Sequence, residues 1–385
     1  MPDASHGVEV EIICNAWPQL CYNVCAKDHI SWEDIMKRRN LVIGMRTIGI
    51  CLAASTFVLG MTASVSAQNT PPQANNVLVL KKQGTFYVGG TIEFRSPNSS
   101  TTVTGDIRSL PGNIAVHQMY VEYQVPNVLK YKYPIVFMHG GGHTGEFFRT
   151  TPDGRDGWFT SFTKRGFAVY SVDGSNRGRA GWDPTKRFQA SQSLIPPSDM
   201  EAANMYSEQS AWVAFRWGPS FGTWYSNTQF PKANKDDYLR QIQPAYRDPT
   251  ANPNLKANVQ ALIDKIGPCI LLGWSTGSTN VMQAASSASY APKVKGLIGI
   301  EGFTAGSGGD PAIVKSIPQL TVLGDNLNPA ANQAWSATIN GLGGDSTTVY
   351  LPDVGIFGNG HTLAIELNDE QIADLIENWI KQHVQ

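Results

Sequence analysis

The residues with the clearest chemical potential lie in a glycine-flanked run, Gly-Trp-Ser-Thr-Gly, at residues 273–277. An apolar run at residues 269–272 precedes it and predicts a buried strand, and a segment rich in Ala, Ser, Gln and Met follows it and predicts a helix. A serine on such a strand-to-helix turn holds its hydroxyl above a sheet, because small flanking residues let the backbone bend. The helix dipole there favours developing negative charge. The pattern predicts Ser275 as a nucleophile.

A second glycine-rich run, His-Gly-Gly-Gly-His at residues 139–143, comes directly after an apolar run at residues 133–138. A turn of this kind aims backbone N–H groups at an oxyanion, and the second donor is the N–H of the residue after the nucleophile, Thr276. One such donor stabilises a transition state by about 3 kcal/mol. A phosphate-binding loop is excluded, because the Gly-Lys-Ser/Thr ending is missing.

A general base is expected late in the chain, after the last predicted strand. His361 occupies that place, in the run Gly-Asn-Gly-His, whereas His383 lies near the end of an amphipathic helical segment. The acid that orients the base has two candidates, Glu301 after the run 294–300 and Asp325 after the run 320–323. Chain order permits both. Spacing alone favours Asp325, because the acid follows that strand more often.

Short apolar runs alternate with helical segments over most of the chain. Strands covered on both faces read as such runs, which lie at residues 133–138, 167–172, 268–273, 294–300, 320–323 and 347–351. The helical candidates are residues 157–164, 280–290, 330–342 and 370–383. We therefore expect an α/β fold with a mostly parallel central sheet flanked by helices. An antiparallel region precedes it, predicted as strands at residues 77–80, 85–88, 91–94 and 114–123.

Residues 181–258 interrupt this alternation. The segment has no apolar run typical of a buried strand, yet it is rich in aromatic residues and contains Trp182, Trp212, Trp217 and Trp224. A long insertion in an α/β domain is usually functional, so we interpret it as a cap over the substrate site. Packing over a sheet edge is the alternative. The predicted substrate-binding residues are Trp217 in the insertion and Gly142, His143 and Trp274 near the glycine loop and the nucleophile.

Residues 1–67 read as an N-terminal extension and signal peptide. Basic residues 36–39 precede an apolar run at 48–59, and small residues end near Ala67. The apolar run is shorter than the roughly 20 residues of a membrane span. This predicts a secreted or periplasmic protein whose domain is residues 68–385, with no membrane attachment after cleavage. A retained N-terminal anchor is the alternative, and Met36 and Met45 are alternative start sites.

Composition narrows the function class. The chain has 385 residues, with 30 Lys and Arg against 31 Asp and Glu, so no basic excess favours nucleic acid or an anionic membrane surface as a partner. Its 42% hydrophobic content excludes a disordered chain. Of five cysteines only Cys269 lies beyond residue 67, within an apolar run, so neither a disulfide nor a metal pattern remains there.

With these motifs the chain resembles the α/β-hydrolase superfamily, and more narrowly a group of secreted bacterial esterases related to the sulfonylurea-herbicide esterase. The matching segments are residues 136–140, 144–145 and 150–158, Asp173 with residues 177–179, the turn around Ser275, residues 300–301, and residues 351–361. The resemblance covers most of the chain from residue 77 onward.

The resemblance implies a triad acid at Glu301 rather than Asp325, and an oxyanion donor at Gly141. It also suggests a homodimer. Some members carry two adjacent cysteines where this chain has Gly141 and Gly142, so the rigidity of this loop is the point where the resemblance is weakest.

The resulting expectation is a serine carboxylic-ester hydrolase that uses Ser275, His361 and Glu301 and passes through an acyl-enzyme. Its substrate would be a small to medium apolar or aromatic ester, and neither a metal nor a cofactor is needed. A lactonase or amidase would use the same triad. A non-catalytic ligand-binding protein on a hydrolase scaffold is the alternative of another class, and it would typically lack a triad member.

Overall fold

A computed structural model describes residues 77–95, 107, 110–247 and 251–384. The predicted signal peptide, residues 1–67, lies outside the described residues. Within the described part of the chain, no helix is both long and apolar enough to cross a membrane.

The central feature is an eight-stranded sheet in the order β1-β2-β4-β3-β7-β8-β9-β10. The strands are β1 (Leu80–Arg95), β2 (Gly112–Pro126), β3 (Ile135–Met138), β4 (Val169–Asp173), β7 (Cys269–Trp274), β8 (Val294–Ile300), β9 (Gln319–Leu323) and β10 (Ser346–Tyr350). Strand β2 is antiparallel to both of its neighbours, and every later pair is parallel. The predicted mostly parallel sheet with an antiparallel N-terminal region is confirmed.

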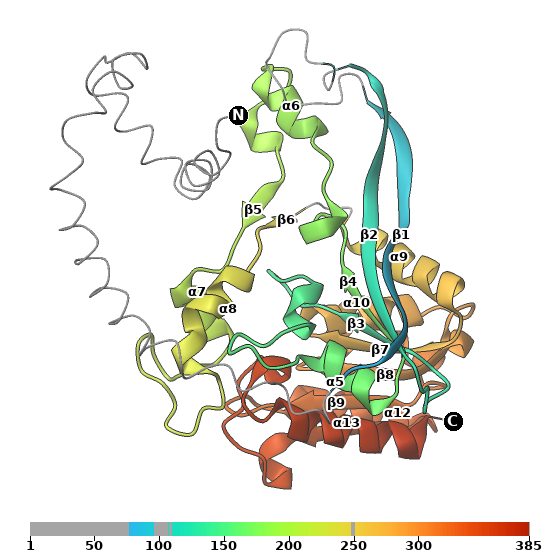
Figure 1. Ribbon diagram of the computed structural model, residues 1–385, viewed down its shortest axis with the longest axis vertical. Helices are drawn as coiled ribbons and strands as arrows, with labels where there is room; N and C mark the ends of the chain where they lie inside the picture. Colours follow the sequence, from blue (N-terminus) through green and yellow to red (C-terminus); the bar gives the residue numbers. More distant parts are fainter. Residues whose placement is uncertain (1–76, 96–106, 108–109, 248–250, 385) are drawn as a thin grey trace, which may run out of the picture. The chain divides into compact units, whose positions relative to one another are not determined.

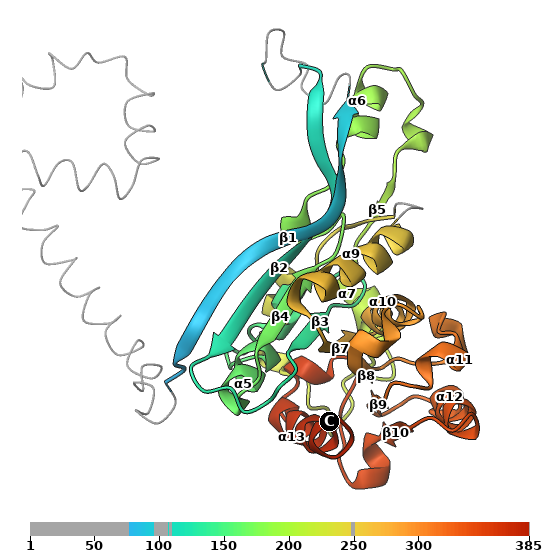
Figure 2. The same ribbon diagram turned by 90° about the vertical axis from the view of Figure 1, so that its right-hand side faces the viewer.

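Helices cover both faces of this sheet (Figure 2). They are α5 (Trp158–Arg165) and α13 (Asp369–His383) on one face, and α9 (Ala251–Ile266), α10 (Thr276–Ala285), α11 (Pro311–Val314) and α12 (Ala330–Gly341) on the other. Successive residues of β3 therefore point to opposite faces of the sheet. Ile135 and Phe137 pack in the core with α5 and α13, whereas Val136 and Met138 pack in the core with α9 and α10. Each fully buried side chain of this kind contributes about 1.5–3 kcal/mol.

The N-terminal strands differ from the prediction, because β1 is one long strand and not three short ones. Gly89 and Gly90 have φ of 63° and 68°, and His117 on β2 has φ of 63°, so the pair bends at this point without ending. Asn258 of α9 stabilises the bend. Its Oδ1 accepts from Gly90 N at 3.1 Å, and its Nδ2 donates to His117 O at 2.8 Å. A side chain remote in sequence therefore satisfies backbone groups that would otherwise end the strand.

The insertion is shorter than predicted. It contains α6 (Thr185–Ser191), β5 (Ala202–Asn204), α7 (Glu208–Ala214), α8 (Lys235–Gln241) and β6 (Ala245–Arg247). Residues 251–258 belong instead to α9, which packs against the sheet and α10. In Figure 1, α6 lies beside the far end of β1 and β2, where Arg95 Nη2 is 2.9 Å from Asp183 Oδ2.

Short 3-10 turns connect the remaining elements: η3 (Gly145–Phe148), η4 (Gly178–Ala180), η5 (Pro197–Asp199), η6 (Lys232–Asn234), η7 (Ala291–Lys293), η8 (Ala305–Ser307), η9 (Leu351–Val354) and η10 (Leu363–Ile365).

Candidate active site

Ser275 lies on the turn between β7 and α10, with φ of 55° and ψ of −123°. This backbone conformation is strained for a residue with a side chain, and such strain clusters at functional sites. Two flanking glycines permit the turn. A Cβ on Gly277 would lie 2.3 Å from the carbonyl oxygen of Met138, and one on Gly273 would lie 2.4 Å from the Gly277 backbone. The Ser275 N–H donates to Ile300 O at 2.8 Å, which ties the turn to β8.

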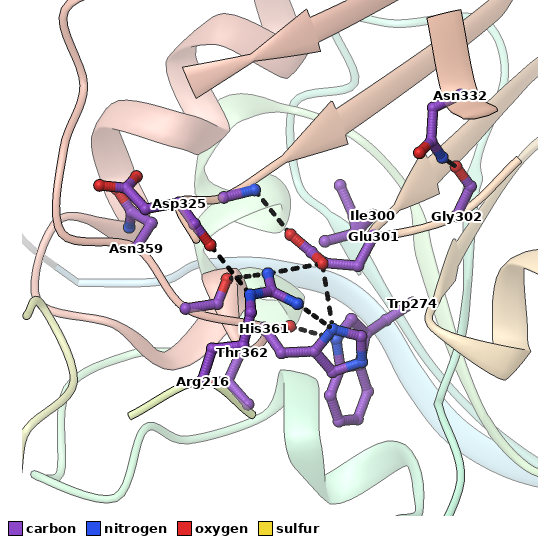
Figure 3. Close-up of polar contacts among 12 residues, drawn as sticks. Arg216, Trp274, Ile300, Glu301, Gly302, Asp325, Asn332, Asn359, His361 and Thr362 are labelled. Atoms are coloured by element: carbon purple, nitrogen blue, oxygen red, sulfur yellow. Dashed lines mark hydrogen bonds and ion pairs between the residues drawn. The ribbon is translucent and has the colours of Figure 1, made fainter. Parts of the chain in front are cut away.

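Glu301 directly follows β8, which is the neighbour of β7 in the sheet, and it has φ of 56°. Its N–H donates to Val322 O at 2.9 Å, so the residue continues the pairing with β9. The side chain is only 3% exposed. Its Oε1 accepts from Gly324 N at 2.6 Å, and its Oε2 lies 3.1 Å from His361 Nδ1 (Figure 3). The structure thus brings Glu301 and His361 into contact.

His361 lies on the loop after β10, and its backbone is fixed from two sides. Its N–H donates to Phe215 O at 3.0 Å, and its carbonyl accepts from Trp274 Nε1 at 2.6 Å. Trp274 is the residue before Ser275, so this bond links the loop to the serine turn. The fully buried Glu366 organises the same loop. Its Oε1 accepts from the backbone N–H of Gly360 at 3.0 Å and of the residue after His361, Thr362, at 3.2 Å.

Asp325, the alternative acid, is placed differently. Its Oδ2 accepts from Gly358 N at 2.8 Å, and its own N–H donates to Asn359 O at 2.6 Å. The Asp325 carboxylate therefore contacts the backbone of the histidine loop, while the Nδ1 of His361 faces Glu301.

Arg216 is a site residue that the sequence reasoning missed. It comes from the insertion, two residues after the end of α7, and its guanidinium makes three hydrogen bonds to oxygen atoms and a contact with the His361 ring (Figure 3). Nη2 donates to Glu301 Oε2 at 2.7 Å and to Gly360 O at 2.9 Å, and Nε donates to Asp325 O at 2.9 Å. Arg216 also has a strained φ of 55°. Nothing local in the sequence marks it, because its partners lie 85 to 144 residues away.

Two opposing effects act on the pKa of Glu301. Complete burial raises it, because water no longer solvates the charge. The contacts with His361, Arg216 and the Gly324 N–H outweigh burial, and the pKa is lowered. Glu301 is therefore an anion at neutral pH, which is the state that orients an imidazole and stabilises its protonated form.

The glycine loop lies against the serine turn. A Cβ on Gly140 would lie 2.7 Å from the Trp274 ring and 3.1 Å from Ser275 Cβ, so only glycine fits this close approach. The same point on Gly141 lies 3.7 Å from Thr276 Oγ1. The structure thus brings Gly141 close to Thr276, the two residues predicted to donate to an oxyanion.

The two histidines of the loop are buried. His139 Nε2 accepts from Gly174 N at 3.0 Å, and its Nδ1 lies 2.8 Å from Gly140 O, so the Nδ1 carries the proton. Burial lowers the pKa of His139 to about 4. His143 holds Gly141 O through Nδ1 at 2.9 Å, and burial lowers its pKa to about 3. Both rings are neutral supports of the loop.

The predicted substrate-binding residues are placed below the site surface. His143 and Trp274 are completely buried, and Trp217 is 1% exposed. Their rings pack against other aromatic side chains, with His143 and Trp274 centroids 4.9 Å apart. Gly142 has φ of 72°, and its carbonyl accepts from Gln243 N of the insertion at 2.7 Å.

Among known proteins, the chain is similar to a lipase and to an esterase. No family model matches the chain. The sequence is 27% identical over 327 residues to Probable secreted lipase phiG of Fungal sp. (strain ATCC 74256), covering 69% of this chain and 86% of the relative. A solved structure, described as a novel bacterial esterase, superposes with a TM-score of 0.74 at 30% identity. That match covers 82% of this chain and 99% of the esterase.

Proposed function

Because the chain belongs to the α/β-hydrolase superfamily, we propose that it is a serine carboxylic-ester hydrolase that uses Ser275, His361 and Glu301. One observation carries this proposal: His361 Nδ1 lies 3.1 Å from Glu301 Oε2. A hydrogen bond from the side chain of Trp274, the residue before Ser275, to the His361 carbonyl supports it. The relatives named as a secreted lipase and a bacterial esterase support an ester as the substrate.

The reaction would begin when Ser275 Oγ attacks the ester carbonyl carbon and His361 Nε2 takes the hydroxyl proton. Glu301 accepts from His361 Nδ1, which holds the ring in one tautomer and stabilises the imidazolium. The N–H groups of Gly141 and Thr276 bind the oxyanion. His361 then protonates the leaving alcohol. Water, deprotonated by His361, attacks the acyl-enzyme and releases the acid, which restores Ser275.

The body of the substrate is proposed to be small to medium-sized and apolar or aromatic, since the insertion beside the site is aromatic. Within the insertion, Trp212 and Trp224 have ring centroids 4.4 Å apart, and so do Trp217 and Phe230. Burial changes the role we assign to His143, Trp217 and Trp274. We propose that they support the glycine loop and the serine turn from below, whereas Gly142 is buried where the loop meets the insertion.

We also propose that the enzyme is exported. The relative named as a secreted lipase supports an exported enzyme, in agreement with the signal-peptide pattern at residues 1–67. Cleavage near Ala67 is testable by N-terminal sequencing of the exported protein. The homodimer implied by the resemblance stays a prediction, which light scattering of the purified chain tests.

Labelling with a fluorophosphonate probe tests the proposed nucleophile. The probe should label the wild-type protein at Ser275, located by peptide mass spectrometry, and Ser275→Ala should lose both labelling and hydrolysis of 4-nitrophenyl esters while it keeps its circular dichroism spectrum. Ser289→Ala, an exposed serine beyond the same helix, is the matched control and should keep both. Retained hydrolysis by Ser275→Ala would refute the assignment. A panel of lactones and amides separates an esterase from a lactonase or amidase.

A further inference from the structure

The loop after β4 lies along the glycine loop of the site. Gly174 donates its N–H to His139 Nε2 at 3.0 Å, and a Cβ on Gly178 would lie 2.6 Å from Thr144 Cγ2. The segment between these two contacts carries Arg177. Because β4 and β3 are parallel neighbours, both loops leave the same edge of the sheet.

Arg177 is part-buried, and its Nη1 is buried without a hydrogen bond among the described residues. The nearby carboxylate of Asp173 is already bound by Arg179, through Nε at 2.8 Å and Nη2 at 3.0 Å. Buried N–H donors in proteins normally have an acceptor, and a guanidinium stays protonated, so the Nη1 of Arg177 lacks an expected acceptor.

Tyr206 of the insertion packs against the same glycine loop. Its hydroxyl lies 3.8 Å from the point where a Cβ of Gly141 would stand, and its ring lies 2.7 Å from the same point on Gly142. Burial lowers the pKa of His143 on the glycine loop, and the charge of Arg177 adds to this effect. The segment that carries Arg177 and the Tyr206 side chain thus both lie against the glycine loop.

We propose that Arg177 binds a carboxylate carried by the ester substrate. This inference rests on the proposed function and narrows its substrate class to monoesters that keep a free acid group on an otherwise apolar or aromatic body. A guanidinium binds a carboxylate through two parallel N–H bonds, which fixes the ester relative to Ser275. An uncharged ester leaves the cation unpaired and is therefore bound less well.

Matched ester pairs test the subsite on either side of the scissile bond. Mono-4-nitrophenyl glutarate against 4-nitrophenyl valerate changes one end of the acyl part, and 4-acetoxybenzoate against 4-tolyl acetate changes the alcohol part. We expect kcat/KM of the wild type to be at least tenfold higher for the acid-bearing member of one pair, and the pair identifies the side. The preference should weaken with added salt, because salt screens the attraction.

Arg177→Met should lower kcat/KM for the preferred acid-bearing ester at least tenfold and change that for the uncharged partner less than threefold. Arg177→Lys should keep part of the preference. Arg187→Met, an exposed arginine on α6, is the control and should behave as wild type. The Tm of Arg177→Met should be unchanged or higher, since the variant removes a part-buried guanidinium whose buried Nη1 has no hydrogen bond.

Two outcomes would overturn the subsite. One is equal kcat/KM for both members of each pair in the wild type. The other is a lower Tm of Arg177→Met together with equal losses on charged and uncharged esters, which marks a structural role. Failure of the proposed function looks different, because then the wild type hydrolyses none of the four esters, and the substrate subsite falls with it.

Discussion

Arg216 Nη2 lies 2.7 Å from Glu301 Oε2, the same carboxylate oxygen that His361 Nδ1 approaches to 3.1 Å. The guanidinium also lies close to the imidazole, with Nη1 3.4 Å from Nδ1. When Nδ1 carries its proton and donates to Glu301, neither of these two nitrogens has a lone pair for the other. The Arg216–His361 contact then brings together two groups that compete for one carboxylate. The insertion thereby contributes a charge to the pair formed by acid and base.

Arg216→Met is expected to lower kcat/KM about tenfold at pH 7, equivalent to about 1.4 kcal/mol of transition-state stabilisation. Arg216 helps to lower the pKa of Glu301, so its loss lets burial raise that pKa. Glu301 is then protonated at higher pH, and the acidic limb of the pH–rate profile moves to higher pH. The measurement is kcat/KM from pH 4 to 9, with the exposed Arg240→Met as control. A pH profile of unchanged shape would show that Arg216 is dispensable to the acid.

Glu301→Gln should reduce kcat by about 10³–10⁴, as loss of a triad carboxylate does in serine hydrolases. Asp325→Asn should cost less than tenfold, because Asp325 contacts the loop backbone at Gly358. Both substitutions keep the side-chain volume, and kcat with 4-nitrophenyl butyrate together with Tm separates a catalytic loss from misfolding. The reverse order of the two losses would assign the acid to Asp325.

Glu366 should make the stability of the protein depend on pH. Burial raises its pKa to about 7 from 4.5, although four hydrogen bonds to its carboxylate oppose the shift. The folded state therefore holds this proton more tightly than the unfolded state does, and the contribution of Glu366 to stability falls as pH rises from about 4.5 through 7.

The difference in Tm between wild type and Glu366→Gln measures this contribution, since other titrating groups are common to both. We expect wild type minus variant to be more positive at pH 5 than at pH 8. The exposed Glu370→Gln is the matched control and should show no such trend. An equal difference at both pH values would contradict the raised pKa.

Gly140→Ala and Gly141→Ala form a matched pair in one loop. A Cβ on Gly140 meets the Trp274 ring at 2.7 Å, whereas one on Gly141 has its nearest neighbour at 3.7 Å. We expect Gly140→Ala to displace the serine turn and to lower kcat at least tenfold, and Gly141→Ala, which keeps its N–H, to stay within about threefold for small esters. Equal effects of the two variants on kcat would mean that the close approach at Gly140 is unimportant.

Much of the sheet could be predicted from the sequence because buried parallel strands are continuously apolar. The run at 294–300 coincides with β8, and the predicted helix at 370–383 begins one residue after α13 does. The helix α9 was not predicted, because its first residues were assigned to the insertion, which was expected to end at residue 258. The long β1 was divided at Gly89 and Gly90 because the partner that stabilises the bend, Asn258, is 168 residues away from Gly90.

The candidate site likewise contains residues that the local sequence predicts and residues that only the folded chain brings together. Ser275 and the glycine loop follow from local turn geometry, and His361 follows from its place in the chain. Spacing alone favoured Asp325 as the acid, and only the resemblance pointed to Glu301. Spacing cannot tell which of two strand ends turns its carboxylate toward the imidazole. Arg216, Glu366 and Arg177 have no sequence signature, because each acts through contacts that exist only in the folded chain.

The backbone of His361 has a consequence for amide hydrogen exchange. Its N–H is bonded to Phe215 O of the insertion, whereas the N–H groups of Ser275 and Glu301 are bonded to Ile300 O and Val322 O at the ends of β8 and β9. Exchange at Ser275 and Glu301 therefore requires opening of the sheet itself, but exchange at His361 requires only that the insertion separates from its loop. The rate of deuterium uptake at this amide therefore measures how often the insertion separates from the loop that carries His361.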